Sequence, residues 1–335
     1  MLTRRSFLKS TVSGASLVAL APTVPAFLAR SLAAETQAHD GRILVVIELN
    51  GGNDGINTVV PFADEGYARH RTALRLPADR LHMLSDGIGL HPSMRAAADL
   101  VEDGRLAIVQ GVGYPNPDRS HFRSMAIWQS ARFDEREHGT FGWLGRTLDA
   151  APSTAAGPAA MGVGVGDPPL AIRGRRAVHA TIERFEDIEL EGLARTDVSA
   201  DAAGITANGA DDLASFVRRR TLDAYATADR LADVSRPEDS AARYPATKLG
   251  GRLQLVARLI KADLGPRVFY TVQPGYDTHA AQLNEHARLL AEFSGAVKAF
   301  LDDLKAARLH DRVAVLAFSE FGRRVAENGS QGTDH

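Results

Sequence analysis

The sequence contains no cysteine. This absence excludes disulfides, Fe–S clusters, zinc sites built from thiolates, and cysteine nucleophiles. Any metal ion must therefore be bound by histidine, carboxylate, hydroxyl or amide groups. The chain also lacks a G-x-G-x-x-G fingerprint near its start, which makes a dinucleotide-dependent oxidoreductase a distant alternative.

Neither an excess of positive charge nor a long apolar run is present after residue 33. Lysine and arginine number 39 against 41 acidic residues, which gives a formal net charge of -2. Nucleic acid partners require a basic surface, so the sequence argues against one. A membrane-spanning helix needs about 20 consecutive, mostly apolar residues. We therefore expect no transmembrane segment in the mature chain.

What the chain does have at its start is an export signal. Arg4 and Arg5 precede Ser-Phe-Leu-Lys, and an apolar run extends from Val12 to Leu28. This order is typical of a twin-arginine signal peptide, here residues 1–33 with cleavage after Ala33. A membrane anchor is the alternative, but the glycine and prolines in the run disfavour a spanning helix. We expect the twin-arginine export machinery as a partner and a periplasmic or secreted location.

Removing residues 1–33 takes away four positive charges and no negative one, so the formal net charge moves from -2 to -6. The remaining domain, residues 40–335, comprises about 300 residues and can bury a full core. Apolar runs that alternate with helical patterns predict a mostly parallel sheet sandwiched by helices. A charged segment low in aromatic residues predicts a helical insertion at residues 181–240. The predicted strands are Ile43–Leu49, Leu106–Val112, a strand beginning at Val268, and Val313–Phe318.

The first predicted strand is followed directly by NGGNDG, residues 50–55. Two glycines let the backbone turn tightly and come close to a ligand. Asn50 and Asp54 offer oxygen ligands for a metal ion. A plain turn rich in asparagine and glycine is the alternative.

A second polar group follows Leu106–Val112 and precedes a helical pattern. Ser120 lies near the start of that helix, where backbone N–H groups favour an anion. This placement predicts Ser120 and His121 as catalytic residues, with Arg119 and Arg123 holding the non-bridging oxygens of a substrate. A plain helix cap at Ser120 is the alternative.

The stretch Val268–His286 predicts a strand, a turn and a helix. Asp277 and His279 stand in the turn, at the carboxyl end of the strand, where ligands bind in α/β folds. The alternative is a helix cap at Asp277 and a surface His279. His286 lies on the helix that follows and is expected at the surface rather than as a ligand.

Acid and imidazole groups also follow the last predicted strand. Glu320 stands at its carboxyl end, and the chain stops at Asp334 and His335. Oxygen and imidazole ligands without thiolates suit one or two divalent ions, Zn or Ca, with Mn and Mg as alternatives. Two such ions could clamp a tetrahedral oxyanion while Ser120, ionised by one of them, attacks phosphorus or sulfur in line.

Five motifs, taken together, resemble a known family. NGGNDGINTVVP, RSHF, YDTH, SEFGR and GTDH look like the motifs of bacterial twin-arginine-exported proteins of unknown function that are assigned to the alkaline phosphatase and sulfatase superfamily. The resemblance extends over essentially the whole mature chain. It implies an alkaline-phosphatase-like α/β sandwich with a hydrolytic metal site.

By this resemblance Ser120 corresponds to the nucleophile, and Asp277 with His279 to the first acid and imidazole pair. Glu320 corresponds to the acid after the next strand, and His335 to the last histidine. Apart from Asn50 and Asp54, the resemblance thus implies the same metal ligands and nucleophile as the strand ends indicate.

Three features depart from the superfamily pattern. Asn50 stands where the superfamily has Asp, unless Asp54 substitutes for it. The spacing between Asp277 and His279 is shorter than usual, and Phe321 follows Glu320 where His is expected. If GTDH is instead the second Asp-His pair, the last histidine lies beyond residue 335.

Two hypotheses from different classes follow. The first is a secreted metal-dependent hydrolase of phosphate or sulfate esters, acting on a small molecule or a glycan ester. The second is a catalytically degenerate superfamily member that binds an anionic glycan or a partner protein. Because GTDH is followed by a further apolar strand in the resembling family, we also expect this chain to be C-terminally truncated. An open edge near Val313–Phe318 and a poorly held His335 should result.

Overall fold

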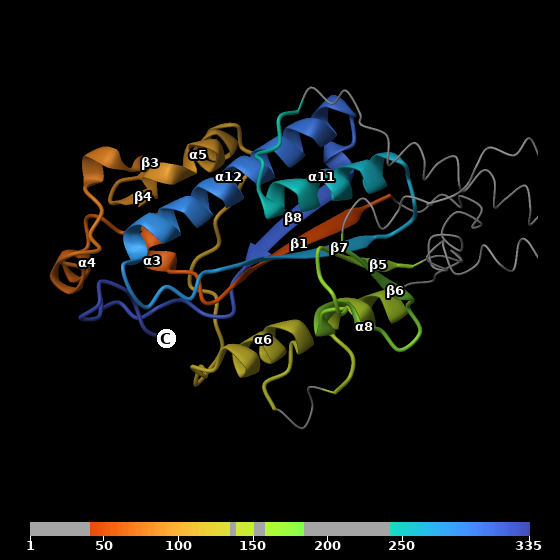
Figure 1. The fold of residues 1–335 in the computed structure, drawn as a ribbon, viewed down its shortest axis with the longest axis horizontal. Coiled ribbons are helices and arrows are strands. Elements are labelled where there is room, and N and C mark those ends of the chain that lie inside the picture. The colour runs from red at the N-terminus through yellow and green to blue at the C-terminus, as the bar shows by residue number, and fades with distance from the viewer. Residues whose placement is uncertain (1–40, 135–138, 151–157, 184–241) are drawn as a thin grey trace, which may run out of the picture.

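The computed structural model describes residues 41–134, 139–150, 158–183 and 242–335. Its centre is a five-stranded sheet with the order β6-β5-β7-β1-β8, in which each pair of neighbours is parallel (Figure 1). The strands are β1 (Ile43–Asn50), β5 (Ala160–Val163), β6 (His179–Ile182), β7 (Val268–Pro274) and β8 (Val313–Phe318). The signal peptide predicted at residues 1–33 lies outside the described residues.

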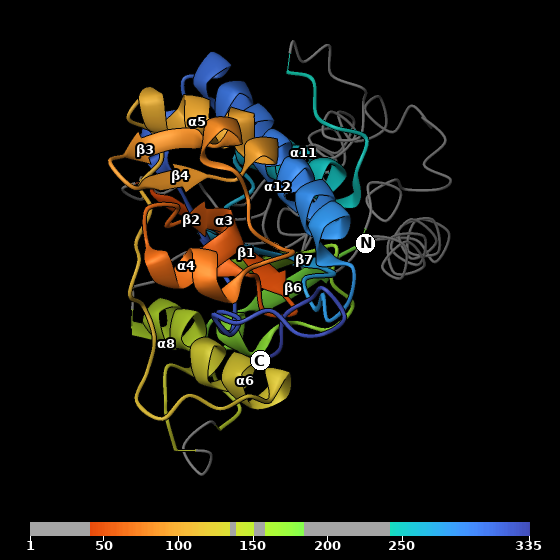
Figure 2. The ribbon, with the colours of Figure 1, turned by 90° about the vertical axis from the view of Figure 1, so that its left-hand side faces the viewer.

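Strand β1 lies between β7 and β8 and is buried on both faces, which explains its nearly continuous apolar sequence. Leu44 of β1 is level with Val268 of β7 and Ala314 of β8. Because the three strands are parallel, their carboxyl ends meet at one edge of the sheet. Figure 2 looks onto this edge.

Helices cover both faces of the sheet (Figures 1 and 2). Phe269 and Tyr270 are neighbours on β7 but belong to cores on opposite faces, because successive side chains of a strand alternate. One face carries α5 (Arg95–Glu102), α11 (Lys248–Lys261) and α12 (Gln282–Ala306), and the other carries α6 (His121–Ser130) and α8 (Trp143–Ala150). The predicted α/β architecture, a parallel sheet with helices on both sides, is confirmed.

A second, smaller sheet follows the loop after β1. It is antiparallel, with the order β2-β4-β3, and Val60 and Tyr67 belong to a core of its own. Its elements and the adjoining helices are α3 (Gly55–Thr58), β2 (Val59–Val60), α4 (Glu65–His70), β3 (His82–Ser85) and β4 (Ile88–Leu90). Within the described ranges, no helix has both the length and the apolar character to cross a bilayer.

The strand predicted at Leu106–Val112 is wrong. This segment lies outside any sheet, and the side chains of Val109 and Val112 are 77% and 58% exposed. An apolar run of this length fits a buried strand only if a neighbour supplies a hydrogen-bonding partner. Among the described residues no strand pairs with it.

Strand β8 pairs on one side only in the described sheet, and Leu316 on it is 41% exposed. The open edge expected near Val313–Phe318 is therefore present.

The expectation that His335 is poorly held is wrong. Its Nδ1 lies 2.6 Å from the backbone oxygen of Arg119, and its ring stacks on Phe321. These contacts order the residue.

The helical insertion predicted at residues 181–240 lies almost entirely outside the described residues. Its first positions are described and are not helical. Thr181 and Ile182 belong to β6, where they pair with Gly162 and Val163 of β5. The β-branched residues at this point therefore continue the sheet rather than start a helix.

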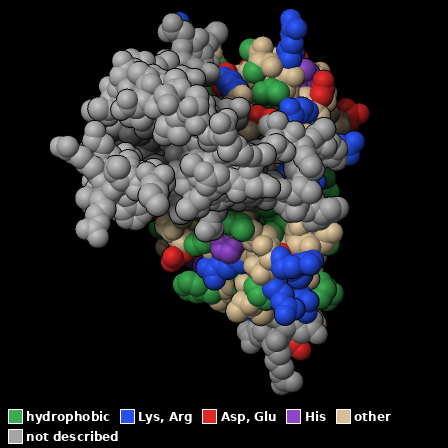
Figure 3. Space-filling view, turned by 90° about the vertical axis from the view of Figure 1, so that its right-hand side faces the viewer, with side chains coloured by type: hydrophobic (Ala, Val, Ile, Leu, Met, Phe, Trp, Pro, Cys, Tyr) green, Lys and Arg blue, Asp and Glu red, His purple; other side chains and the backbone are tan. Residues whose placement is uncertain are grey.

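Figure 3 shows the side of the molecule opposite the carboxyl edge of the sheet. Lysine and arginine side chains gather on the lower part of this view. A small hollow at the amino end of β1 is also lined by arginines, among them Arg42, Arg267 and Arg312. Positive charge at this end therefore lies across the sheet from the polar cluster described next.

Candidate metal centre

The strands β1, β7 and β8 all end at the candidate site, where Gly51, Asp277 and Glu320 follow them. The backbone φ angles of Gly51 and Gly52 are 118° and 72°, in the region that favours glycine. A Cβ on Gly51 would lie 2.5 Å from the backbone nitrogen of Asp277, and one on Gly52 would lie 2.3 Å from the ring of Phe321. The two glycines thus allow the loops after the three strands to touch.

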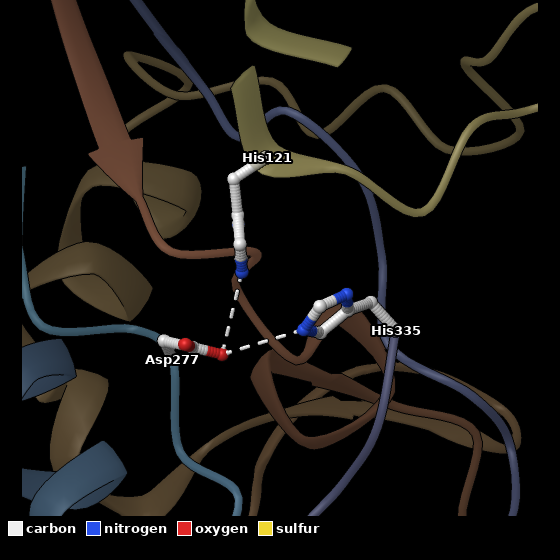
Figure 4. A group of neighbouring side chains, drawn as sticks. All are labelled: His121, Asp277 and His335. Atoms are coloured by element: carbon white, nitrogen blue, oxygen red, sulfur yellow. Dashed lines mark ion pairs between the residues drawn. The ribbon is translucent and has the colours of Figure 1, made fainter. Parts of the chain in front are cut away.

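Asp277 lies among three histidines. Its Oδ1 is 2.9 Å from Nε2 of His279, 3.5 Å from Nε2 of His121 and 3.9 Å from Nε2 of His335. Figure 4 shows the His121 and His335 side chains directed toward the Asp277 carboxylate. The ligand atoms of His121, Asp277 and His335 all lie within 4.8 Å of one another. The fold thus joins residues from the start of α6, the loop after β7 and position 335.

Each of these histidines is held at its other ring nitrogen by an oxygen atom. The Nδ1–oxygen distances are 2.8 Å for His121 with Glu320, 3.2 Å for His279 with Asp334 and 2.6 Å for His335 with the backbone carbonyl of Arg119. Carboxylate and carbonyl oxygens only accept hydrogen bonds, so Nδ1 donates in each case. In a neutral imidazole the lone pair is then on Nε2.

The three Nε2 atoms consequently present lone pairs to one space. Those of His279 and His335 are 3.1 Å apart, and Nε2 of His121 is buried without a hydrogen-bond partner. Nη1 of Arg323 lies 3.5 Å from Nε2 of His279, and the remaining repulsion among the lone pairs of neutral rings would be relieved by a proton or by a bound cation. Histidine ligands of metals are usually held in this way, with the second ring nitrogen bonded to a carboxylate or carbonyl. The residues present therefore fit a divalent ion.

Arg323 sets the electrostatics of the cluster. Its guanidinium is fully buried, and Nη2 lies 2.5 Å from Oδ1 of Asp277. Burial raises the pKa of Asp277, but the hydrogen bond and charge of Arg323, together with His279 and His121, lower it below its ordinary value. Asp277 is therefore an anion at neutral pH. Arg323 was not among the predicted site residues, although it ends the SEFGR motif and stands in the arginine pair that follows Glu320.

Glu320 was predicted as a metal ligand, and the structure gives it a different position. Its carboxylate is fully buried and accepts hydrogen bonds from the backbone of Gly51 at 2.9 Å and from Ser319 at 3.0 Å. The same oxygen that Gly51 contacts also binds His121. Glu320 therefore orients a histidine of the cluster instead of facing the Nε2 atoms itself.

Asp334 is a further residue that the predicted ligand set left out. Its carboxylate accepts from Nδ2 of Asn328 at 2.9 Å as well as from His279. These two hydrogen bonds, that of Asn328 first, lower the pKa of Asp334. Its place in the GTDH motif is the sequence signal that could have identified it.

Ser120 is exposed and caps α6, where its hydroxyl lies 3.5 Å from the backbone nitrogen of Arg123. It directly precedes His121 and so lies at the rim of the cluster. The guanidinium of Arg123 pairs with Asp118 at 3.4 Å. Arg119 contributes its backbone carbonyl to His335. The structure therefore brings the predicted catalytic and substrate-binding segment next to Asp277.

Two predicted ligands lie outside the cluster. Asn50 donates to Glu48 at 2.9 Å. Asp54 forms a fully buried ion pair with Arg71 at 2.6 Å, and Gln282 also donates to it. Both carboxylate oxygens of Asp54 bind the guanidinium, so this residue serves the fold rather than the cluster. Burial raises the pKa of Asp54, but Arg71 outweighs this effect and lowers it.

His286 was expected at the surface, and the structure buries it. Only 1% of the residue is exposed. Nε2 lies 2.9 Å from Oδ1 of Asn53, and the ring meets His91 edge-on at a centroid distance of 5.9 Å. The helical pattern did not reveal this position because His286 lies on the side of α12 that packs under the loop after β1.

Stability should fall as the pH drops from about 6.5 toward 4. Burial, opposed by Asp54 and reinforced by Arg71 and Arg323, lowers the pKa of His286 to about 4 from an ordinary value of 6.5. Between these values the unfolded chain binds the extra proton, so folding loses up to about 3 kcal/mol on acidification. Urea unfolding measured from pH 7 to 4 should give a shallower pH dependence for His286→Gln than for the natural chain. Equal slopes would contradict a neutral, buried His286.

No curated protein and no solved structure matches the chain. A family match, in contrast, extends over residues 42–335, and thus over every described element of the fold. It includes all residues of the polar cluster, from His121 to His335. The chain therefore belongs to the family described as "Protein of unknown function (DUF1501)".

Proposed function

We propose that this protein is a metal-dependent hydrolase of phosphate or sulfate esters. The supporting observation is the convergence of three histidine Nε2 atoms on the Asp277 carboxylate, with every Nδ1 already bound to an oxygen. An imidazole-rich ligand set suits zinc better than calcium, which prefers oxygen ligands. The parallel sheet between helices is compatible with an alkaline-phosphatase-like fold.

In this proposal His121, His279, His335 and Asp277 hold the ion. A bound divalent ion would act as a Lewis acid and would ionise a hydroxyl or water at neutral pH. Glu320 and Asp334 keep the lone pairs of His121 and His279 directed at the ion. Arg323 keeps Asp277 ionised.

The ester would bind at the start of α6. The backbone N–H groups of this ten-residue helix and its dipole favour an anion. Arg119 and Arg123 stand on either side of Ser120 in sequence and are exposed, so both could hold non-bridging oxygens. Ser120 is the proposed nucleophile because its hydroxyl lies at this helix start, next to His121.

Ser120→Ala is expected to abolish hydrolysis of an aryl phosphate or aryl sulfate by the zinc-loaded protein. Its free energy of unfolding should fall by only about 1 kcal/mol, the usual effect of losing a helix cap. Thr247→Ala is the matched control, because Thr247 caps α11 through the backbone N–H of Gly250. It should lose similar stability and keep full activity. Full activity in Ser120→Ala would reject Ser120 as the nucleophile.

A binding protein without turnover is the second candidate. The observation that favours it is the hydrogen bond between Arg323 and the Asp277 oxygen that faces the histidines. In this case zinc and an anionic glycan or partner protein would bind, and no ester would be cleaved. Zinc binding measured by calorimetry, together with absence of hydrolysis by the natural chain on both esters, would favour this candidate.

Export by the twin-arginine pathway is part of the proposal. It is supported by the order of Arg4-Arg5, the apolar run and the small residues near Ala33. The mature protein would then act in the periplasm or outside the cell. Fractionation of bacteria that express the natural chain and an Arg4→Lys, Arg5→Lys variant tests this location, since export should stop in the variant.

A further inference from the structure

We propose that Arg323 is the positioning residue that assembles this metal centre, an inference that rests on the proposed function. Its guanidinium is buried, and every polar atom of it contacts the loops around the cluster. The acceptors are the backbone oxygens of Gly51, Gly52, Tyr276 and Thr333 and the carboxylate of Asp277. One side chain therefore joins three chain segments that are far apart in sequence.

The contacts are short and use the whole guanidinium. Nε lies 2.8 Å from the oxygen of Gly52, Nη1 lies 2.7 Å from that of Thr333, and Nη2 lies 2.5 Å from that of Gly51. The planar group offers five donors in fixed directions, so one Arg323 can satisfy several carbonyls at once. A lysine at this position offers a single ammonium and could not reach the same set.

Each segment that Arg323 holds leads to a ligand of the proposed ion. Asp277 is bound directly, and Thr333 stands two residues before His335. The backbone of Gly51 accepts from Arg323 through its oxygen and donates through its nitrogen to Glu320. Glu320 in turn binds the Nδ1 atom of His121, so Arg323 also acts on that ligand through a chain of three hydrogen bonds.

The charge of Arg323 matters as well as its shape. It is a buried cation that lies directly against the Asp277 carboxylate, with Nη2 2.5 Å from Oδ1. Its Nη1 lies 3.5 Å from Nε2 of His279, so it also contacts this ligand directly. Loss of the guanidinium should therefore loosen the ligand set even if the sheet and helices remain intact.

The test compares zinc affinity in Arg323→Lys and Arg71→Lys, measured by competition with a chromophoric chelator on the full natural chain. Arg71 is a matched control: its side chain is equally buried and also binds one carboxylate and two backbone carbonyls. We expect Arg323→Lys to weaken zinc binding by about 10- to 100-fold, as loss of a residue behind metal ligands usually does. Arg71→Lys should change zinc affinity less than about threefold while losing comparable stability.

The outcomes separate the two proposals. If the natural chain binds no zinc, the metal centre itself is wrong. If the natural chain binds zinc and Arg323→Lys binds it equally well, or if both lysine variants weaken binding to the same degree, Arg323 has no special role in positioning. As a readout of geometry, Co²⁺ bound to Arg323→Lys should show an altered visible absorption spectrum, whereas Co²⁺ bound to Arg71→Lys should show the natural spectrum.

Discussion

Replacing Asp54 with alanine should destabilise the folded protein by about 3 to 5 kcal/mol, because the change leaves the buried charge of Arg71 without a partner. Both side chains of this pair are fully buried, with 2.6 Å between Nη1 and Oδ2. Arg71 also donates to the backbone oxygen of Arg324 at 2.9 Å. Asp54→Ala therefore weakens the contact between the loop after β1 and the segment after Glu320. Urea unfolding at pH 7 measures the loss.

Two controls make this result specific. Glu65→Ala removes an exposed pair with Arg69, whose atoms are 3.8 Å apart, and should change stability by less than about 1 kcal/mol. The double variant Asp54→Leu, Arg71→Met removes both buried charges and should regain most of the stability lost in Asp54→Ala. A loss below about 1 kcal/mol in Asp54→Ala would show that the buried ion pair does not hold these loops.

Replacing His279 with glutamine should weaken zinc binding by more than about 100-fold, beyond the range seen when only a residue behind a ligand is lost. Among the three histidines, His279 has the shortest contact with Asp277, 2.9 Å, and its Nε2 lies 3.1 Å from that of His335. Its side chain is 42% exposed, so the fold should tolerate the change. Ester hydrolysis should disappear together with the metal.

His310→Gln is the matched control for this experiment. His310 is 40% exposed, pairs with Asp311 and lies in the turn before β8, away from the cluster. It should leave zinc affinity unchanged. Binding by the natural chain should weaken as the pH falls, because the ligand histidines must lose their protons to bind metal. Unchanged zinc affinity in His279→Gln would place any bound ion elsewhere on the protein.

The sequence predicted the sheet well where a strand pattern and its neighbours agree. Val313–Phe318 has the predicted bounds, and β1 begins at the predicted Ile43 and ends one residue later than predicted, at Asn50. The failure at Leu106–Val112 has a physical cause: apolar periodicity reports that a segment prefers burial, whereas a strand also requires a partner edge. The local sequence of a segment does not show whether another strand is available to pair with it.

The candidate site also has residues that the sequence predicted and residues that it could not predict. Asp277, His279 and His335 were predicted because polar residues after parallel strands must meet at one edge of the sheet. His121 was predicted from a strand at Leu106–Val112 that does not form, and it reaches the cluster from the start of α6 instead. The role of Arg323 could not be predicted, since it depends on carbonyl groups of three distant loops. Asp54 was misassigned for a related reason, because sequence spacing does not show that Arg71 takes both of its carboxylate oxygens.

The position of β1 has a consequence for how this chain folds. Ile43 pairs with Val313, and Leu44 pairs with Val268, so the central strand finds both of its neighbours more than 220 residues later in the chain. At the usual rate of synthesis, roughly ten seconds to one minute separates the emergence of β1 from that of β8. During this interval a strongly apolar strand has no partner, and contacts of such long range form slowly. The nascent chain should therefore depend on chaperones that shield β1, and the histidine cluster should be among the last parts of the molecule to form.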